Sequence, residues 1–516
     1  MIDPIATGLV SAEYAATRPD APAIIASSGN RSFAELHGNA NRLAQALRGA
    51  GLVPGDAVAL FSGNRAEFVE VLMATQRSGL RLTPINSHLT PGEAAFIIGD
   101  CQARAVLVEA RLANGLAALL PETRLRLSFG GRVPGFGDYA GALAAACALA
   151  PPTPLPGTLM LYTSGTTGRP KGVWKPRAET VAPQHEGSIA GYAPGDVALC
   201  AGPAYHAAPL LFDIRWPLAS GVPIVLLERF DARAVLAAIA DHGVTHAHMV
   251  PIHFQRLLAL PAAERQRHDL SSLRMVIHGA APCPIPVKQA MIDWLGPILW
   301  EYYGASEGNS GLFITAEDWL RHPGSVGQRQ GPRGAAGVSV VRDAAGRDLP
   351  DGEEGLIYLP ASPENPFEYW NDPEKTEKAR LGRHYTLGDI GRYDADGWLT
   401  LTGRSAEVII SGGVNIYPAE IDAALASHPA VADACAIGAP DTDWGEAVVA
   451  VIELKPGQTG DAALAAAVLA HVRGQLAGFK LPKRVEFVPH LPRLASGKVP
   501  RATVRAGYWR GRESGI

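Results

Sequence analysis

Hydrophobic and polar residues follow one another along the N-terminal part of the chain in a pattern typical of alternating helices and strands. Between positions 32 and 51, apolar residues such as Leu43 and Leu47 recur at helical spacing, which predicts an amphipathic helix. The apolar run at 57–61 then predicts a strand, and the segment 65–78 predicts a second helix. Such alternation is typical of a parallel sheet with helices packed on its faces. The pattern therefore predicts an α/β fold.

The chain has two candidate boundaries. The run PPTPLPG at 151–157 is rich in proline and is typical of a linker. Near Gly403 and Arg404, glycine-rich loops and short strands begin, which indicates a smaller α+β unit. We therefore expect an N-terminal domain at 1–403 and a C-terminal domain at 404–516.

Charge and cysteine content narrow the class of protein. A net charge of −4 and a pI near 6.4 provide no basic surface of the kind that binds nucleic acid. The longest weakly polar stretch, at 140–150, is too short to span a bilayer, and the N-terminus lacks a basic-then-apolar signal sequence. The five cysteines form no CxxC pair, which favours reduced intracellular thiols. We expect a soluble, cytoplasmic protein without a transmembrane segment; the sequence leaves its oligomeric state open, a homodimer included.

The densest cluster of candidate chemistry is the stretch YTSGTTGRPKGV at 162–173. Because it follows an apolar run, it predicts a buried strand that ends in a tight loop. Glycines let backbone amides turn inward to bind an anion, hydroxyls add donors, and Lys171 adds a compact positive charge. A solvated turn is the alternative, although a turn seldom needs so many phosphate-binding groups. The stretch is not a Walker motif, because Lys171 stands between Pro170 and Gly172.

The segment YYGASEG at 302–308 offers further groups for a nucleotide. Tyr303 has a flat ring on which adenine can stack, and Ser306 can donate to a phosphate. Glu307 can hold Mg²⁺, which prefers carboxylate and phosphate oxygens. An ordinary aromatic-glycine turn is the alternative.

Four histidines lie close together in the segment DHGVTHAHMVPIHF at 241–254. His246 and His248 would share one face of a strand and could bind zinc. However, no acidic or cysteine ligand accompanies them, and the apolar residues around them indicate a buried strand. Hydrogen-bonded core histidines are therefore the favoured interpretation.

Three weaker segments complete the set: HGAAP at 278–282, YTLGD at 385–389 followed by Gly403–Arg404, and PRLASGKVPR at 492–501. Together with the stretches at 162–173 and 302–308, these segments resemble the adenylate-forming superfamily of acyl-CoA synthetases, carrier-linked adenylation domains and luciferases. All five occur in the family's order along the chain. The resemblance covers essentially the whole chain. It implies a large N-terminal domain with doubly wound sheets and a small, mobile α+β C-terminal domain. It also implies two reaction steps: the acid and ATP form an acyl-AMP with release of pyrophosphate, and a thiol then displaces AMP.

The resemblance also assigns roles to individual residues. Lys498 is the implied catalytic lysine, which would stabilise the charge that develops when the carboxylate meets the α-phosphate. Glu307 is the implied metal ligand and a further catalytic residue. Thr386 stands where the family usually has arginine or lysine, and the hinge position is Ala406 rather than the usual Asp or Lys. The residues implied for ATP are Thr163, Ser164, Gly165, Thr166, Thr167, Gly168, Lys171, Gly279, Ala280, Ala281, Tyr302, Tyr303, Gly304, Ser306, Asp389 and Arg404.

The segment PAYHAAPLLF at 203–212 resembles the stretch that carries the family's gating residue. His206 is therefore a catalytic candidate near the carboxylate, with a hydrogen-bonded loop histidine as the alternative. Nearby, Asp213 and Arg215 are expected to pair with each other; that Arg215 binds a second carboxylate is the less favoured alternative. The acid pocket is expected to be apolar and roomy. Its expected residues are His206, Ala207, Phe212, Ala281, Gly304, Gly308 and Gly311.

The family resemblance also implies a site for CoA, formed by Ser411, Gly412, Gly413, Trp444 and Lys480. Glycine would let the pantetheine arm pass along the backbone, and Trp444 would stack on the adenine. Lys480 and Lys483 could meet the phosphates, although Leu481 stands where related ligases often have arginine. Trp444 could instead pack between strands, and the lysines could form a solvated face.

The sequence therefore predicts an ATP- and Mg²⁺-dependent acid–CoA ligase for a fatty, aryl-alkanoic or other bulky apolar acid. An adenylating enzyme that loads a carrier protein is the main alternative. A nucleotide-binding protein without catalysis is a third interpretation, which the residues Glu307, Asp389, Arg404 and Lys498 disfavour.

Overall fold

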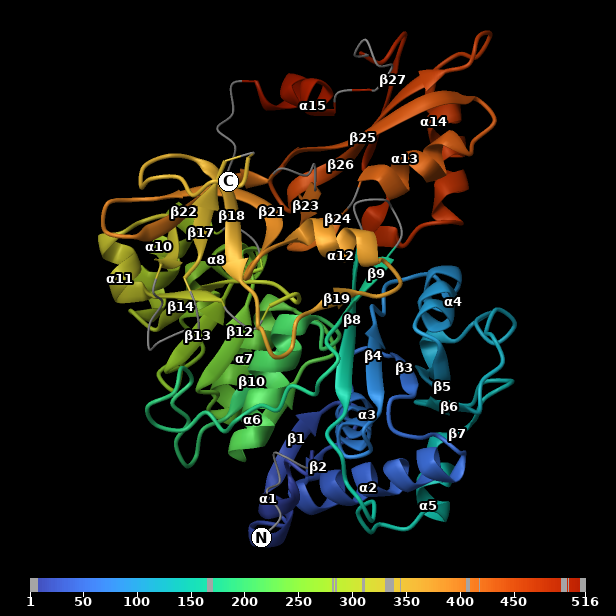
Figure 1. Cartoon of the computed structure of the whole chain (residues 1–516), viewed down its shortest axis with the longest axis vertical. Helices are drawn as coiled ribbons and strands as arrows, with labels where there is room; N and C mark the ends of the chain where they lie inside the picture. The colour runs from blue at the N-terminus through green and yellow to red at the C-terminus, as the bar shows by residue number, and fades with distance from the viewer. Residues whose placement is uncertain are drawn as a thin grey trace.

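The computed structural model describes residues 8–164, 170–280, 283, 285–308, 311–329, 338–343, 345–404, 409–416, 418–492, 499 and 501–510. These residues form four β-sheets with helices packed against them. Three sheets belong to the N-terminal part of the chain, and the fourth to the C-terminal part, which lies at the top of Figure 1 in orange and red. Over the described ranges, we find no helix with the length and apolar character needed to cross a membrane.

The first sheet carries the glycine- and hydroxyl-rich stretch on one of its hairpins. Its strand order is β19-β9-β8-β4-β3-β5-β6-β7. Along the part β8-β4-β3-β5-β6-β7 of this order, neighbouring strands are parallel, whereas β8 and β9 are antiparallel. The strands are β3 (Ala57–Phe61), β4 (Arg81–Ile85), β5 (Ala103–Glu109), β6 (Leu125–Phe129), β7 (Gly137–Asp138), β8 (Thr158–Ser164), β9 (Pro170–Trp174) and β19 (Glu368–Tyr369). The accompanying helices are α2 (Phe33–Gly49), α3 (Ala66–Gln76), α4 (Pro91–Asp100), η1 (Ala110–Leu112) and α5 (Tyr139–Ala145).

The second sheet is parallel in its centre and has one antiparallel strand at each edge, in the order β15-β14-β13-β12-β10-β11-β1-β2. Its strands are β1 (Pro22–Ala26), β2 (Arg31–Ser32), β10 (Ala198–Cys200), β11 (Ile224–Leu226), β12 (His246–Met249), β13 (Met275–His278), β14 (Leu299–Tyr303) and β15 (Leu312–Thr315). The helices of this part are α1 (Ala12–Thr17), the π-helix η2 (Pro209–Arg215), α6 (Trp216–Ser220), α7 (Ala232–His242), α8 (Pro251–Leu258), α9 (Ala262–Arg265), α10 (Ile285–Leu295) and α11 (Ala316–Arg321).

The third sheet is antiparallel and follows the order β16-β22-β21-β18-β17, with β20 paired to β21. Its strands are β16 (Ser325–Gln328), β17 (Val340–Arg342), β18 (Gly355–Pro360), β20 (Arg380–Leu381), β21 (His384–Tyr393) and β22 (Trp398–Arg404), and α12 (Pro373–Ala379) precedes β20. Strand β22 ends at Arg404, beside the expected domain boundary.

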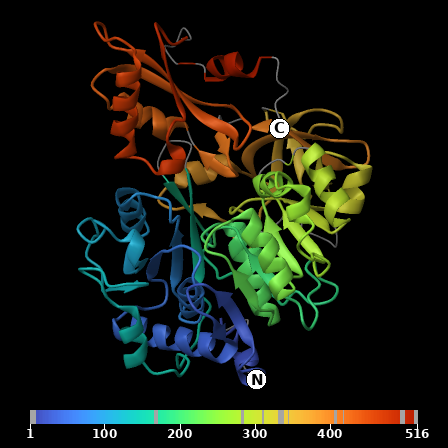
Figure 2. The ribbon, with the colours of Figure 1, turned by 180° about the vertical axis from the view of Figure 1, so that it is seen from behind.

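The fourth sheet belongs to the C-terminal part and follows the order β24-β23-β26-β25, with β27 parallel to β26. In both overall views it lies over the end of the first sheet that holds β8, β9 and α4 (Figures 1 and 2). Its elements are β23 (Ile409–Ser411), β24 (Val414–Ile416), α13 (Pro418–Ala426), β25 (Val431–Asp441), β26 (Gly445–Leu454), α14 (Ala462–Arg473), η3 (Gly478–Lys480), β27 (Arg484–Val488) and α15 (Arg501–Trp509). The predicted mixed α/β class, with a smaller α+β part at the C-terminus, is confirmed.

The three elements predicted near the N-terminus form as expected. Helix α2 begins with a capping box between Ser32 and Glu35, and it buries Leu43 and Leu47. Strand β3 covers the predicted range, and α3 lies inside the predicted helix. One placement differs from the prediction: Lys171 lies on β9, opposite Thr163 of β8, rather than in a loop. The antiparallel pairing of β8 and β9 turns the end of the motif into a strand.

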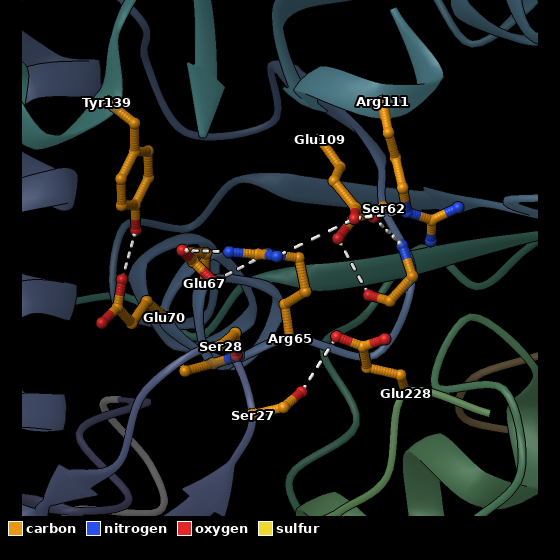
Figure 3. A network of polar contacts seen from close by, with 12 residues as sticks. Ser27, Ser28, Ser62, Arg65, Glu67, Glu70, Glu109, Arg111, Tyr139 and Glu228 are labelled. Carbon is orange, nitrogen blue, oxygen red and sulfur yellow. Dashed lines mark hydrogen bonds and ion pairs between the residues drawn. The ribbon is translucent and has the colours of Figure 1, made fainter. Parts of the chain in front are cut away.

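A polar network ties the first sheet to the second (Figure 3). Arg65 contacts both carboxylate oxygens of Glu67 at 3.0 and 3.1 Å, and Glu109 accepts the amide hydrogen of Gly63 at 2.9 Å. The amide of Ala66, the first residue of α3, crosses to the second sheet and donates to the Ser28 hydroxyl beyond β1 at 2.9 Å. Next to it, Ser27 donates to Glu228 beside β11 at 2.9 Å. These contacts hold the loop between β3 and α3, which borders the cavity described next.

Candidate functional site

A cavity of about 1480 Å³ opens between the N-terminal sheets and the C-terminal sheet. It brings together most of the residues that the sequence assigned to ATP, the acid and CoA. Those on its walls are Thr163, Ala280, Tyr302, Tyr303, Gly304, Ser306, Glu307, Gly308, Gly311, Asp389, His206, Ala207, Phe212, Ser411, Gly412, Gly413, Trp444 and Lys480. Seven predicted residues lie outside the described part of the chain: Gly165, Thr166, Thr167, Gly168, Ala281, Ala406 and Lys498. Ser164 and Arg404 are described only as backbone positions on β8 and β22.

Charged groups gather where the phosphates are expected. The ammonium of Lys171 lies 2.6 Å from a carboxylate oxygen of Asp372, and this hydrogen bond holds the pKa of Asp372 below its usual range. Lys375, on α12, faces the cavity, and burial together with the nearby Lys171 lowers its pKa to about 8. The Lys375 ammonium also lies 4.4 Å from the centre of the Tyr369 ring. This corner therefore holds two lysines and a single paired aspartate.

Glu307 provides the carboxylate on the same side of the cavity. Its oxygen Oε1 accepts a hydrogen bond from the Tyr369 hydroxyl at 3.0 Å. Burial raises the pKa of Glu307 above its ordinary value, while the bond from Tyr369 and the charge of Lys375 oppose that rise. Gly308, whose amide closes a turn on the carbonyl of Ala305 at 3.2 Å, has no room for a side chain, because a Cβ there would lie 1.9 Å from the Tyr385 hydroxyl. The close approach of Tyr385 explains why this turn contains glycine.

Tyr303 and Asp389 meet at the part of the cavity predicted for the nucleoside. The Tyr303 hydroxyl donates to Oδ2 of Asp389 at 2.8 Å, and both side chains are buried. Asp389 on β21 stands opposite Arg404 on β22, so the pairing of these strands brings two residues predicted for ATP into register. Across from them, the backbone of Gly279 packs so tightly on Tyr302 that a Cβ would lie 2.5 Å from its carbonyl oxygen.

His206 lines the cavity, on the loop that enters η2. Asn64 fixes this loop: it donates to the carbonyl of Gly202 at 2.8 Å and accepts from the amide of Ala204 at 2.8 Å. The His206 imidazole is accessible from the cavity, yet burial within the protein lowers its pKa to about 4, with a further contribution from His88. At neutral pH His206 is therefore uncharged.

Aromatic rings form the wall beyond His206. The Phe212 ring centre lies 5.0 Å from that of Tyr302, 4.7 Å from Trp216 and 5.7 Å from His248. Nε2 of His248 lies 3.3 Å from the Tyr302 hydroxyl. This part of the wall is thus largely aromatic.

The predicted pairing between Asp213 and Arg215 is wrong. Oδ1 of Asp213 accepts the amide hydrogen of His248 at 2.9 Å, and burial raises the pKa of this carboxyl well above its ordinary range. Arg215 instead donates through Nη2 to the backbone carbonyl of Glu179. The two side chains separate because neighbouring positions of a helix point in different directions.

The histidine cluster is hydrogen-bonded and packed, as favoured. The ring of His246 contacts the Thr245 hydroxyl at 2.8 Å and the carbonyl of Ala190 at 2.9 Å, so both ring nitrogens are used. His253 stacks on Phe230 with ring centres 3.8 Å apart. Within the described ranges, no group of three or more His, Cys, Asp or Glu residues is arranged to hold a metal ion.

Residues predicted for CoA meet at the other end of the cavity. The amide of Gly412 donates to the carbonyl of Trp444 at 2.8 Å, which joins the two predicted segments. Gly412 has φ = +59°, and a Cβ there would lie 2.5 Å from the Trp444 ring. Arg256 of α8 and Lys483 lie 5.0 and 4.5 Å from the centre of the same ring. This end therefore offers an aromatic surface surrounded by two cations.

Lys480 lies in this region but is engaged by two carboxylates. Its ammonium lies 2.9 Å from Glu93 on α4 and 2.8 Å from Glu420 on α13, and only 3% of its side chain is exposed. In this arrangement Lys480 joins the C-terminal part of the chain to the first sheet rather than facing a phosphate. The role predicted for it at CoA thus stays a prediction that this arrangement does not favour.

Sequence reasoning missed several residues of the site. Asn64, Tyr369 and Arg256 lie in segments without a recognisable motif. Asp372 and Lys375 had a visible signal in the segment NDPEKTEKA, because an aspartate followed by a proline is typical of a helix start. Asp372 does cap α12, accepting the amide hydrogen of Lys375 at 3.0 Å.

Comparison with known proteins identifies the family. Residues 11–362 match the family model of the AMP-binding enzymes, and residues 420–498 match the model of the AMP-binding enzyme C-terminal domain. The chain therefore belongs to the AMP-binding enzyme family, and the predicted membership of the adenylate-forming superfamily is confirmed. The predicted enzyme class, an AMP-forming acid–thiol ligase, is confirmed with it.

Two curated relatives cover nearly the whole chain. A fatty acid–[acyl-carrier-protein] ligase of Streptomyces coeruleorubidus is 32% identical over 510 residues, which are 96% of this chain and 95% of the relative. A feruloyl-CoA synthase of Amycolatopsis sp is 33% identical over 497 residues, 95% of this chain and 96% of the relative.

Solved structures agree with the fold. The amide bond synthetase McbA from Marinactinospora thermotolerans has a TM-score of 0.82 at 29% identity, with 94% of this chain and 97% of that chain covered. A double mutant of the o-succinylbenzoate CoA synthetase from Bacillus subtilis, bound with its product analogue OSB-NCoA, has a TM-score of 0.81 at 26% identity, with coverage of 96% and 98%. The same enzyme in complex with the acyl-adenylate intermediate OSB-AMP has a TM-score of 0.64, with coverage of 96% and 97%.

Proposed function

We propose that this protein is an ATP- and Mg²⁺-dependent acid–CoA ligase. The observation that carries the proposal is that one cavity is lined by Tyr303, Glu307 and Asp389, by His206, and by Trp444. An enzyme that first adenylates an acid and then transfers the acyl group to a thiol needs its ATP site and its thiol site to meet at the carboxyl group of the acid. His206 is the natural position for that group.

The first half-reaction joins the acid to the α-phosphate of ATP. A carboxylate oxygen attacks the α-phosphorus, the bond to the bridging oxygen of pyrophosphate breaks, and acyl-AMP remains. Asp389, oriented by the Tyr303 hydroxyl, would accept hydrogen bonds from the ribose. Lys375 would offset charge on the departing pyrophosphate, and Lys498 would offset charge at the α-phosphorus.

Glu307 fits the metal that this family implies. It is a carboxylate on the cavity wall with one oxygen held by Tyr369, and its burial favours a cation as partner. Mg²⁺ bound there would neutralise charge on the phosphate oxygens. Tyr369 would keep the carboxylate pointed at the phosphates.

The second half-reaction exchanges AMP for a thiol. The thiol sulfur attacks the acyl carbon, the bond to the phosphate oxygen breaks, and AMP leaves. Gly412 lets the pantetheine arm pass beside the backbone, while Trp444, Arg256 and Lys483 would bind the adenine and phosphates of CoA. Neutral His206 can accept a hydrogen bond from the thiol as the proton departs.

The arrangement of the two parts of the chain supports the second step. The chain resembles the Bacillus enzyme with a CoA product analogue more closely than the same enzyme with an acyl-adenylate, with TM-scores of 0.81 and 0.64. The contact of Lys480 with Glu93 belongs to this arrangement. We infer that it is the thiol-transfer conformation, and that Lys498 faces the nucleotide only after the C-terminal part rotates.

For the acid, the aromatic wall of Phe212, Trp216 and Tyr302 favours a bulky apolar body over acetate. Each additional buried CH₂ group should contribute about 0.8 kcal/mol until the pocket is full. The feruloyl-CoA synthase and fatty acid ligase among the relatives support the same choice.

Transfer to a carrier protein is the second candidate. It is supported by the fatty acid–[acyl-carrier-protein] ligase, which is 32% identical over 96% of this chain. A carrier delivers the same pantetheine arm but no adenine. Trp444, Arg256 and Lys483 would then have no nucleotide to bind, so this cluster favours CoA.

The decisive experiment measures pyrophosphate release from a panel of acids, with CoA, with a phosphopantetheinylated carrier protein, or with neither, and identifies the thioester by mass spectrometry. We expect the CoA thioester. Trp444→Leu should raise the KM for CoA about tenfold and leave acyl-AMP formation unchanged. Transfer to the carrier alone would overturn the choice of acceptor, and no acyl-AMP from any acid would overturn the proposed function.

A further inference from the structure

Arg215 places a guanidinium on the wall of the acyl part of the cavity. It is the last residue of η2 and lines the cavity together with Phe212 and Trp216 from the same helical segment. Among the residues that the structure describes, its one hydrogen-bond acceptor is the carbonyl oxygen of Glu179, reached through Nη2. Nε and Nη1 of Arg215 make no such bond there, and they are not sealed away from the cavity. Two donors of a planar fork are thus available to a ligand.

The charges around Arg215 neutralise it only in part. The carboxylate of Glu179 opposes the fall in the pKa of Arg215 that burial causes, but the same carboxylate lies 2.6 Å from the ammonium of Lys175 and is therefore shared between two cations. Asp213 turns away to the amide of His248, and its raised pKa favours the uncharged acid. Burial lowers the pKa of Arg215 only to about 10, so the guanidinium stays charged at neutral pH.

The position of Arg215 relative to His206 fits the far end of a substrate. The chain is helical from Ala207 to Arg215, mostly as the π-helix η2, so Arg215 stands at the end of this segment remote from His206. The rings of Phe212, on the same segment, and of Tyr302 line the cavity with their centres 5.0 Å apart. A molecule activated beside His206 would therefore lie along apolar rings and reach a cation at its other end.

We propose that the acid substrate carries a second carboxylate at the end remote from the one that is activated, and that Arg215 binds it. This inference rests on the proposed function and names the substrate class for the same site. A carboxylate matches the guanidinium fork with two parallel hydrogen bonds and supplies the missing negative charge. The substrate would be an apolar-bodied dicarboxylic acid longer than malonate.

The test compares acids of equal length that differ only at the far end: adipate with hexanoate, suberate with octanoate, and sebacate with decanoate. Pyrophosphate release gives kcat/KM for each acid. We expect the best dicarboxylate to exceed its monocarboxylate about tenfold or more. Arg215→Met, which keeps the length of the side chain, should raise the KM for that dicarboxylate about tenfold to hundredfold and spare the monocarboxylate. Arg215→Lys should restore part of the preference, because it keeps the charge and loses the fork.

Arg177→Met is the matched control, because it removes an exposed cation from the same wall and should leave the ratio of the two acids unchanged. Equal losses for both acids in Arg215→Met would mean that Arg215 only holds the Glu179 carbonyl, and would overturn the inference. A wild-type enzyme that activates monocarboxylates as well as dicarboxylates would overturn it too, while leaving the ligase function intact. If the wild type activates no acid at all, the ligase function fails, and the inference fails with it.

Discussion

The two ends of the cavity are built in different ways. At the nucleotide end, the contacts join residues of the N-terminal part of the chain: Tyr303 with Asp389, and Tyr369 with Glu307. These contacts hold whatever the position of the C-terminal part. If the C-terminal part rotates as proposed, the nucleotide end should therefore keep its organisation.

At the thiol end, the contacts join both parts of the chain. Arg256 of α8 lies over Trp444, and Lys480 reaches Glu93 on α4. A rotation of the C-terminal part, as proposed, would break these contacts. Under the proposed function, the first half-reaction would therefore depend on preorganised side chains, and the second on a conformation that must be stabilised.

The largest expected effect concerns Lys498, which lies outside the described residues. Because the charge it offsets exists only while the carboxylate meets the α-phosphate, Lys498→Ala should slow acyl-AMP formation about a thousandfold or more. Thioester formation from synthetic acyl-AMP should be largely spared. Single-turnover kinetics of each half-reaction measures both. Equal loss of the two steps in a folded variant would contradict the separation of the two ends.

Glu307→Gln should slow acyl-AMP formation by a smaller factor, about a hundredfold, since it removes the carboxylate proposed for Mg²⁺ but keeps a group that Tyr369 can contact. The thioester step from synthetic acyl-AMP should change little. The measurement is pyrophosphate release as a function of Mg²⁺ concentration, with Glu374→Gln on the exposed face of α12 as the control. Near-normal rates at limiting Mg²⁺ would remove the assignment.

These two variants probe roles that were predicted from the sequence alone, and the basis of the prediction is physical. Glu307 and Lys498 lie in short segments whose residue types serve one chemistry wherever the chain places them. The pairing of Asp213 with Arg215 was predicted wrongly, because the prediction rested on nearness in sequence, and a helix turns neighbours apart. Likewise, Lys480 is a basic residue in the expected place, but its partners Glu93 and Glu420 lie far away along the chain.

The helix and strand pattern predicted α2, β3 and α3 well, because their apolar positions are buried within one layer. It could not predict that Asn64, in the loop between β3 and α3, fixes the loop before His206. That contact depends on how the first and second sheets pack, which no local pattern records.

Glu93→Gln tests the thiol end directly and should have a moderate effect. Glutamine keeps the capping box with Thr90 at the start of α4, so the helix should remain, while the charge that faces Lys480 is lost. We expect thioester formation from acyl-AMP to slow about tenfold, about 1.4 kcal/mol, with acyl-AMP formation unchanged or faster. The same two single-turnover assays apply. A slowing confined to acyl-AMP formation would show that the observed arrangement is not the one used for the thiol.

The smallest expected effect is a pH dependence at the nucleotide end, where Lys375 has a pKa lowered to about 8 by burial and by Lys171. Below pH 8 its ammonium can attract phosphate; above pH 8 it loses the proton, so the KM for ATP should rise about threefold to tenfold between pH 7 and pH 9. Lys375→Met should remove this rise, whereas Lys378→Met, which removes an exposed lysine paired with Glu374, should keep it.

The direction of the pKa shift of Lys375 can also be checked by measuring stability against pH. The folded-state pKa lies below the unfolded value of 10.5, so the unfolded chain binds more protons between pH 8 and 10.5, and this lysine makes the ATP-free protein more stable as pH rises through that window. If the KM for ATP does not change with pH in either the wild type or Lys375→Met, the lysine does not face the phosphates. The charges at the nucleotide end would then be balanced by ion pairs within the protein alone.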